Sequence, residues 1–118
     1  MSAVVEEHAR AHIVSDSPDE HRAVPVDLRY DPDADPRTVR VSFPGPGARC
    51  EWAFTRELLE RGLRAPARSG DVRIWPCGRV QAVMEFHSPQ GVAVIEFDCV
   101  PLMRFLRRTY AAGASLSR

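Results

Sequence analysis

Four histidines are the residues of this sequence best suited to transfer a proton near neutral pH or to bind a metal ion. His8 and His12 are four residues apart, a spacing that on a helix would suggest paired metal ligands. The surrounding residues alternate instead between polar and apolar, with Ala9, Ala11 and Ile13 on one face, as is typical of a strand. No third ligand accompanies the pair. The pattern favours solvated strand histidines, and we expect neither a metal site nor a bound cofactor.

Two carboxylates, Glu85 and Glu96, are candidates for acid–base catalysis because they lie on strands expected to form one hairpin. Carboxylates across a hairpin are, however, more often solvated or paired with arginine. The sequence contains no lysine and no asparagine, which excludes a Walker-type phosphate loop, a Schiff-base lysine and a Cys-His-Asn protease. GxGxxG and GxSxG motifs are also missing. We therefore expect no catalytic residue and no enzyme activity.

Three cysteines, Cys50, Cys77 and Cys99, are odd in number and form no CxxC pair. They favour reduced, mostly buried thiols over a disulfide framework or a zinc site. The acidic segment DPDADP (31–36) lacks the central glycine and terminal glutamate of a calcium loop, so it is expected to be a solvated turn. The first residues have no long apolar run, and no stretch approaches the ~20 apolar residues of a membrane span. We expect a cytoplasmic protein without direct membrane insertion.

The charge is balanced overall but unevenly distributed along the chain. All 16 basic side chains are arginine, and they match 16 acids. Residues 1–35 hold nine acids and three arginines, whereas residues 36–118 hold seven acids and thirteen arginines. The two parts can attract each other within one fold or between subunits. Alternatively, they orient a basic face toward an acidic partner.

Apolar alternation predicts the strands that position these side chains. It places strands near residues 9–13, 24–30, 38–43, 50–54, 71–75, 80–86 and 91–98. SDSPDE (15–20) and PGPG (44–47) are expected to be turns, and RAPARSG (64–70) a loop. The segment 91–98 is apolar at nearly every position, which predicts a central strand covered on both faces.

Two segments are expected to be helical. The first covers 55–63, with Thr55 as N-cap and Gly62 as the glycine that ends it. The second runs from Pro101 to 111 and separates an apolar face from a basic one. Its apolar face carries Leu102, Phe105, Leu106 and Thr109, and its basic face carries Arg104, Arg107 and Arg108. Together the elements predict an α+β fold: antiparallel sheet or sheets of about seven strands, with two helices packed on one side, in a single domain.

Trp75 is the aromatic residue most suited to an interface. It shares strand parity with Arg73, opposite the apolar side chains of its strand, so it lies either at an interface or in a small second core. Arg73, Trp75, Arg104, Arg107 and Arg108 are the interface candidates, and the same five residues would serve a single-stranded nucleic acid groove. Uncovered sheet edges predict a homo-oligomer.

Four segments resemble a known family. LRYD (28–31), EWAFTRELL (51–59), GDVRIWP (70–76) and FLRRT (105–109) look like the SsgA-like protein family, small cytoplasmic proteins that act in sporulation-specific cell division of actinobacteria. The resemblance covers residues 8–111 and leaves tails at 1–7 and 112–118. A GC-rich genome agrees with the missing lysine and asparagine, whose codons are rich in adenine.

The resemblance implies several properties of the chain. It implies a fold similar to the Whirly proteins, assembly as a trimer, and no catalytic residue. It also implies an adaptor that is recruited to the septum, where it helps place septa or recruits the division GTPase FtsZ, another SsgA-like protein or cell-wall machinery. Single-stranded nucleic acid binding is the alternative, because Whirly proteins bind such strands.

Overall fold

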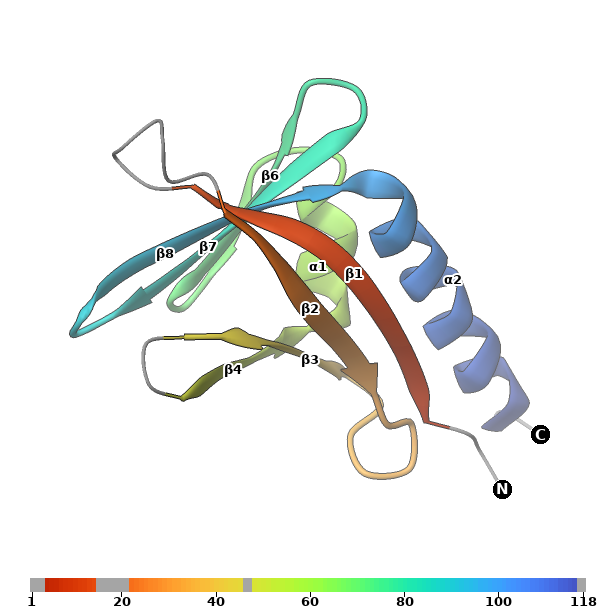
Figure 1. Cartoon of the computed structure of the whole chain (residues 1–118). Helices are drawn as coiled ribbons and strands as arrows, with labels where there is room; N and C mark the ends of the chain where they lie inside the picture. Colours follow the sequence, from red (N-terminus) through yellow and green to blue (C-terminus); the bar gives the residue numbers. More distant parts are fainter. Residues whose placement is uncertain (1–3, 15–21, 46–47, 117–118) are drawn as a thin grey trace.

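Eight antiparallel strands form one continuous sheet in the structure, a computed structural model that describes residues 4–14, 22–45 and 48–116 (Figure 1). Across the sheet the strands follow the order β4-β3-β2-β1-β8-β7-β6-β5. Two helices complete the fold, so the α+β class is confirmed, with eight strands in place of about seven. The strands are β1 (Val5–Val14), β2 (Arg22–Tyr30), β3 (Thr38–Pro44), β4 (Arg49–Thr55), β5 (Ala67–Ser69), β6 (Val72–Cys77), β7 (Gln81–Ser88) and β8 (Gly91–Asp98).

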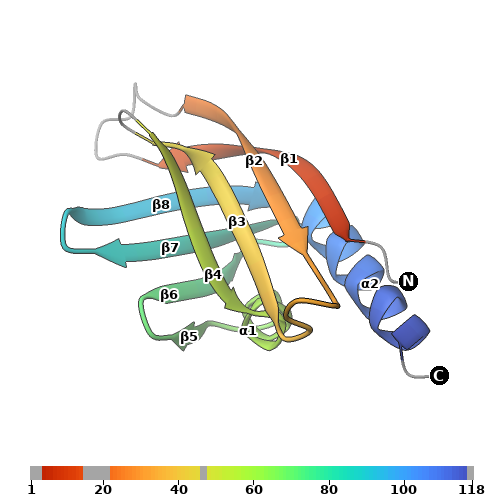
Figure 2. The same ribbon diagram turned by 90° about the horizontal axis from the view of Figure 1, so that it is seen from below.

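The sheet folds over on itself, so that β1–β4 cross over β5–β8 (Figure 2). Phe86 on β7 shows the contact between the two halves. Its ring centroid lies 5.2 Å from that of Trp52 on β4 and 5.6 Å from that of Phe43 on β3. Because strands twist, a sheet this wide coils until its two ends face each other. The inner faces of the two halves therefore share one core, to which both helices contribute.

The predicted strand alternation is confirmed on β2, where Val24, Val26, Leu28 and Tyr30 are all buried. Two boundaries differ from the expectation. β1 begins at Val5, inside the segment taken as a tail, and β5 occupies part of the segment predicted to be a loop. β5 has only three residues and pairs with β6, so it depends on a tertiary partner and leaves no local pattern. The turn expected at 15–20 lies outside the described residues, and so do residues 46–47 of the turn expected at 44–47.

β8 is a central strand, as predicted, but its outer face is not covered. Ile95 and Phe97 are buried in the core. Val92, on the opposite face, is 53% exposed, and Val94 beside it is partly exposed. The apolar run of this strand therefore does not reflect burial on both faces.

The first helix, α1 (Arg56–Gly62), begins as predicted and ends differently. The Thr55 hydroxyl accepts a hydrogen bond from the Leu58 amide at 3.1 Å, which confirms the N-cap. Leu63 caps the other end with an ordinary right-handed backbone. Gly62 is instead the last helical residue and is buried against Ile74, where a Cβ atom would lie 2.4 Å from the Cβ of Ile74. The prediction that Gly62 caps the helix was wrong, because this glycine permits close packing rather than a left-handed turn.

The second helix, α2 (Cys99–Leu116), packs against β1 and β8. Leu102, Phe105, Leu106 and Thr109 are buried, as their spacing predicts. The helix starts two residues before Pro101 and continues five residues past the predicted end at 111. Among the described residues, no helix combines the length and the apolar character that crossing a membrane requires.

The three cysteines are unpaired, but the prediction that they are mostly buried was wrong. Cys77 is exposed, and Cys50 and Cys99 are only partly buried. Cys77 is the last residue of β6 and lies next to the turn that leads to β7. The alternation along β6 places the Cys77 side chain on the same face as Trp75, away from the core, and at the end of the strand that face is open to solvent.

Candidate interaction surfaces

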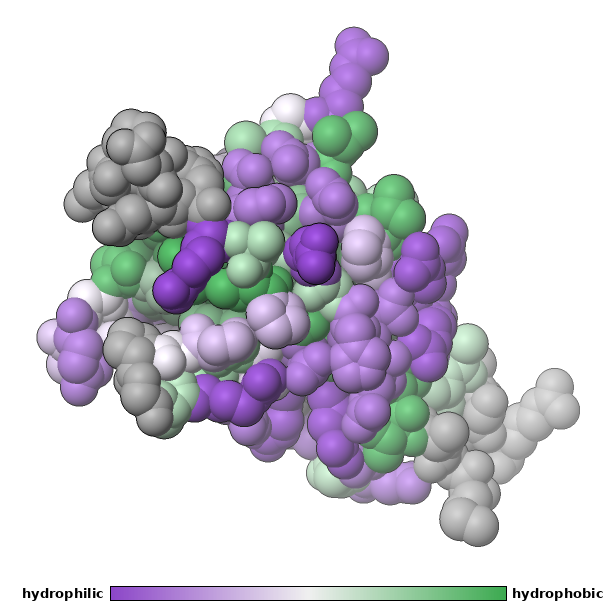
Figure 3. All heavy atoms as spheres, in the orientation of Figure 1, coloured by the Kyte–Doolittle hydropathy of each residue, from purple (hydrophilic) through white to green (hydrophobic). Residues whose placement is uncertain are grey.

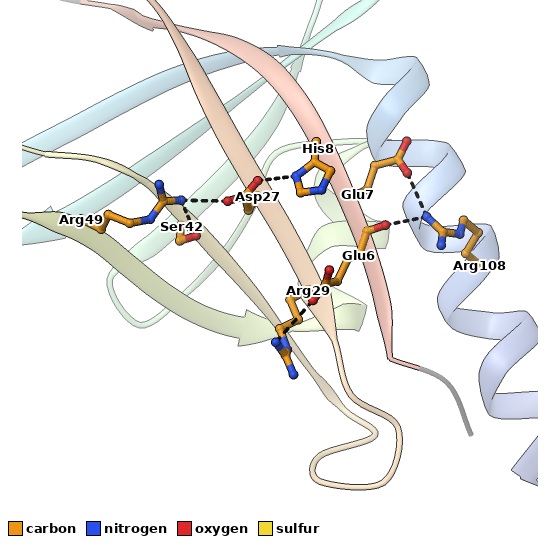
Figure 4. A network of polar contacts seen from close by, with 8 residues as sticks. All are labelled: Glu6, Glu7, His8, Asp27, Arg29, Ser42, Arg49 and Arg108. Atoms are coloured by element: carbon orange, nitrogen blue, oxygen red, sulfur yellow. Dashed lines mark hydrogen bonds and ion pairs between the residues drawn. The ribbon is translucent and has the colours of Figure 1, made fainter. Parts of the chain in front are cut away.

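A network of polar side chains spans the outer face of β1–β4 (Figure 4). His8 Nδ1 lies 2.6 Å from Asp27 Oδ1, and Arg49 Nη2 donates both to Asp27 Oδ2 and to the hydroxyl of Ser42, each at 2.9 Å. Neighbouring carboxylates and guanidinium groups surround a shallow hollow of about 250 Å³. Hydrophilic side chains cover most of the face that is seen in Figure 3, with smaller apolar areas between them.

A serine, a histidine and an aspartate meet in this network, but their order does not suit nucleophilic catalysis. A serine nucleophile needs the histidine directly beside its hydroxyl, with the carboxylate behind the histidine. Here Asp27 lies between His8 and Ser42, and Ser42 is bonded to Arg49. The arrangement is that of a solvent-facing ladder of charge pairs across four strands.

The pKa of His8 can be used to test whether His8 and Asp27 pair as the structure shows. The hydrogen bond to Asp27, and then the charge of Asp27, raise the pKa of His8 above the ordinary value of 6.5. Because the folded-state pKa is raised, any stabilisation from this pair is present below about pH 6.5 and is lost as the pH rises through the folded-state pKa. We expect an NMR titration of the His8 ring protons to give a pKa above 6.5, and Asp27→Asn to return it toward that value. An unchanged His8 pKa in Asp27→Asn would contradict the pairing.

Glu85 is paired with a histidine and an arginine. Glu85 forms a short contact with His87 and an ion pair with Arg73 at 3.7 Å, which agrees with the arginine-paired alternative. Glu96 faces His12 and Val83 on the neighbouring strands. In the described part of the chain, no three His, Cys, Asp or Glu side chains are close enough to hold a metal ion.

Trp75 lies on the outer face of β6, away from the core, together with Arg73. The guanidinium carbon of Arg73 is 5.6 Å from the centre of the Trp75 ring, a cation–π distance. The pairing of β5 with β6 stops at Ala67, which lies opposite Ile74. Trp75, the next residue of β6, therefore has no β5 residue beside it. A hollow of about 230 Å³ opens there, lined by Pro66, Arg68 and Trp75 among others.

Trp75 is one end of an apolar band that crosses the outer face of the sheet. Strand register places Trp75 beside Val83 on β7, and Val94 on β8 beside Val14 on β1. Val83 also lies diagonally from Val94, and Val92 follows Val94 on the same face. Val83 is only 6% exposed, whereas Trp75 and Val94 are partly exposed. Among the described residues, no helix covers this Trp75 band, which consists of Val14, Trp75, Val83, Val92 and Val94.

The arginines of α2 have unequal surroundings. Arg104 donates to the carboxylate of Glu7 at 2.8 Å. Arg108 donates to the same carboxylate at 2.9 Å and to the Glu6 carbonyl at 2.7 Å (Figure 4). Glu7 faces the core side of β1 and is only 8% exposed. Arg107 makes no hydrogen bond or ion pair with any residue that the structure describes. Two of the three arginines therefore fasten α2 to β1, whereas the third has no such partner in the part of the chain that the structure describes.

The five predicted interface residues do not form one surface. Arg73 and Trp75 point away from the core on β6, whereas α2 packs on the core side of β1 and β8. The single basic and aromatic groove expected for nucleic acid therefore does not form from these residues. Sequence reasoning also missed Glu7, which was assigned to a tail. Its parity with Ala9 and Ala11 was the signal that places it on the inner face.

The chain has clear relatives. A family model described as Streptomyces sporulation and cell division protein, SsgA, matches residues 24–115. The chain belongs to the SsgA-like protein family. SsgB of Salinispora tropica, a sporulation-specific cell division protein, is 46% identical over 100 residues, which cover 78% of this chain and 69% of the relative. SsgB of Streptomyces coelicolor is 43% identical over 93 residues, covering 75% of this chain and 67% of the relative.

Some relatives are considerably longer. The 42% identical match to SsgB of Kineococcus radiotolerans covers 75% of this chain but only 56% of that protein. The chain thus spans little more than half the length of this SsgA-like relative.

Solved structures of the family have the same fold. A structure of SsgB, reported with mutations that correlate to longitudinal cell division during sporulation of Streptomyces coelicolor, superposes with a TM-score of 0.82 at 36% identity, covering 95% of this chain and 90% of that one. The SsgA-like sporulation-specific cell division protein of Thermobifida fusca gives a TM-score of 0.80 at 32% identity, covering 93% and 82%. The family resemblance inferred from the motifs is confirmed. The division into tails and a domain at 8–111 and the likeness to Whirly proteins stay predictions.

Proposed function

We propose that this SsgA-like protein is a non-enzymatic adaptor in sporulation-specific cell division. Its curated relatives are sporulation-specific cell division proteins. The chemistry of the described residues supports an adaptor, because Ser42, His8 and Asp27 meet in an order unsuited to catalysis. Without a reaction to perform, the protein acts by binding other molecules.

The Trp75 band is the observation that carries this proposal. At one end of the band, the partly exposed Trp75 lies beside Arg73, which makes a cation–π contact with its ring, and beside the hollow at the sheet edge. Tryptophan and arginine side chains supply much of the binding energy in protein interfaces. Apart from the buried Val83, the apolar side chains of the band are accessible to a partner, and Glu85 and Glu96 lie beside them on β7 and β8.

The partner of this surface is a component of the division machinery. FtsZ, another SsgA-like protein and a cell-wall enzyme are the candidates, and the adaptor is recruited to the septum from the cytoplasm. We propose in addition that the chain forms a homo-oligomer, a trimer by family resemblance. The edge strands β4 and β5 offer unpaired backbone groups for such contacts.

Trp75→Ala is expected to weaken partner binding at least ~30-fold, since truncating a tryptophan that anchors an interface removes about 2 kcal/mol or more. Biolayer interferometry with purified FtsZ and with a second SsgA-like protein measures the dissociation constants. Arg29→Ala is the matched control, because Arg29 is exposed on β2 in the other half of the sheet. Light scattering on both variants reports whether the oligomer persists.

Two results would overturn the proposal. One is a Trp75→Ala protein that keeps both its partner affinity and its oligomeric state. The other is tight, salt-sensitive binding of labelled single-stranded oligonucleotides at two salt concentrations, which would favour the nucleic acid alternative. Fluorescent fusions provide the cellular counterpart: we expect foci of the wild type at future septa and a diffuse signal for Trp75→Ala.

A further inference from the structure

The solvent-facing side of α2 carries apolar side chains that the fold leaves uncovered. Val100 and Met103, about one helical turn apart, are 61% and 49% exposed. Val80, in the turn between β6 and β7, is 68% exposed, and its carbonyl accepts a hydrogen bond from the Cys99 amide at 2.8 Å. That bond holds Val80 against the start of α2. Exposed apolar residues are ordinary when scattered, whereas these three form one group, the α2 patch.

Arginines adjoin the α2 patch without an acidic residue of the helix to balance them. α2 contains three arginines and no aspartate or glutamate. Glu7 reaches Arg104 and Arg108, but each of its oxygens already accepts one of their hydrogen bonds. The side chains of Arg104 and Arg108 remain 53% and 47% exposed, and Arg107 has no partner among the described residues. The face is therefore apolar at the start of α2 and positively charged along the helix.

We propose that this face binds an acidic peptide segment of a partner protein. Apolar side chains of the segment lie on Val100 and Met103, and its carboxylates pair with Arg104 and Arg107. A guanidinium group has five N–H donors, so Arg104 can bind a second carboxylate while it holds Glu7.

The composition of the face favours a peptide over other occupants. A nucleic acid would require aromatic rings that are free to stack on its bases. Tyr110, an exposed aromatic residue of α2, instead has the guanidinium of Arg56 4.0 Å from its ring centre and its hydroxyl bonded to Glu60. A membrane-binding helix normally inserts bulky aromatic or leucine side chains, which this patch lacks. Two copies that met through α2 by a twofold axis would bring their arginines together and repel each other.

The proposal goes beyond the adaptor surface of the preceding section. The α2 patch and the Trp75 band share no residue, and α2 packs on the core side of β1 and β8, whereas the side chains of the band lie on the outer face. If the prediction for one surface is wrong, the prediction for the other can still be tested, because the substitutions that probe them share no residue.

Fluorescence anisotropy tests the proposal with the full chain. The probe is a labelled peptide in which aspartates alternate with leucines, and the control peptide has lysine in place of each aspartate. We expect only the acidic peptide to bind and its affinity to fall at high salt. We expect Arg107→Glu to weaken binding about five-fold or more, since it removes one charge pair and adds a repulsion. Met103→Ser is expected to weaken binding as well.

Arg61→Glu is the matched control, an exposed arginine on α1 whose reversal should leave the affinity within about two-fold. The absence of saturable binding by the acidic peptide would overturn the proposal, as would binding that Arg107→Glu leaves unchanged. Sedimentation with anionic phosphatidylglycerol vesicles that depends on Arg107, without peptide binding, would assign the face to a lipid surface instead. Self-association in light scattering that Arg107→Glu abolishes, without peptide binding, would assign it to a second copy.

Discussion

Replacing Glu7 with lysine is expected to lower the free energy of unfolding by about 3–5 kcal/mol. Glu7 is only 8% exposed, and its carboxylate accepts hydrogen bonds from Arg104 at 2.8 Å and from Arg108 at 2.9 Å. A lysine there would bury a positive charge beside the two half-exposed arginines, and would remove the carboxylate that both arginines bind. Urea denaturation followed by circular dichroism measures the loss. Faster proteolysis within α2 would report that the helix has detached from β1.

Glu6→Lys is the matched control for this prediction. Glu6 is the neighbouring residue on the opposite face of β1, and its pair with Arg29 at 3.4 Å has both side chains more than half exposed. An exposed pair of this kind contributes about 0.2–1 kcal/mol, so the cost should be small. The loss in the free energy of unfolding for Glu7→Leu should lie between those of Glu6→Lys and Glu7→Lys, because leucine removes the charge but suits the apolar surroundings. Equal losses for Glu6→Lys and Glu7→Lys would contradict the buried role of Glu7.

Gly62→Ala is the second change with a large expected effect, a loss of about 2 kcal/mol in the free energy of unfolding. A Cβ atom at this position would lie 2.4 Å from the Cβ and 2.5 Å from the Cγ2 of Ile74, which is fully buried. Helix propensity alone predicts the opposite sign, since alanine is favoured over glycine inside a helix by about 1 kcal/mol. The sign of the change in denaturant midpoint therefore decides between local propensity and packing.

A double-mutant cycle with Ile74→Ala isolates the contact. Ile74→Ala removes the Cγ2 atom, 2.5 Å from the added Cβ atom, but keeps the Ile74 Cβ atom at 2.4 Å. The smaller side chain lets the helix and the strand shift, so Gly62→Ala should cost less in that background, by about 1 kcal/mol. Gly70→Ala is the control, because Gly70 has φ +57 and a Cβ atom there would have no neighbouring atom within 4 Å. Its cost comes from backbone strain and should be the same with or without Ile74. Additive losses for Gly62→Ala and Ile74→Ala would show that the Ile74 atoms beyond Cβ take no part in the clash.

The sequence alone determined the local pattern of the fold. Alternation identified the buried face of β2, and Thr55 marked the start of α1. The spacing of Leu102 and Phe105 identified the buried face of α2, and strand parity placed Trp75 away from the core. These inferences hold because backbone geometry fixes a period of two in strands and 3.6 in helices, whatever the rest of the chain does. The four family motifs, likewise, needed only residue order.

The tertiary structure alone decided which distant residues meet. Glu7 and Arg104 are 97 residues apart, and only the packing of α2 on β1 brings them together. Strand register, which no local pattern specifies between β1 and β8, joins Val14 to Val94 and so builds the Trp75 band. The folding of the sheet onto itself separates that band from the arginines of α2. Long-range pairing depends on the whole core, because each strand satisfies its backbone and buries its apolar face only against a partner elsewhere in the chain.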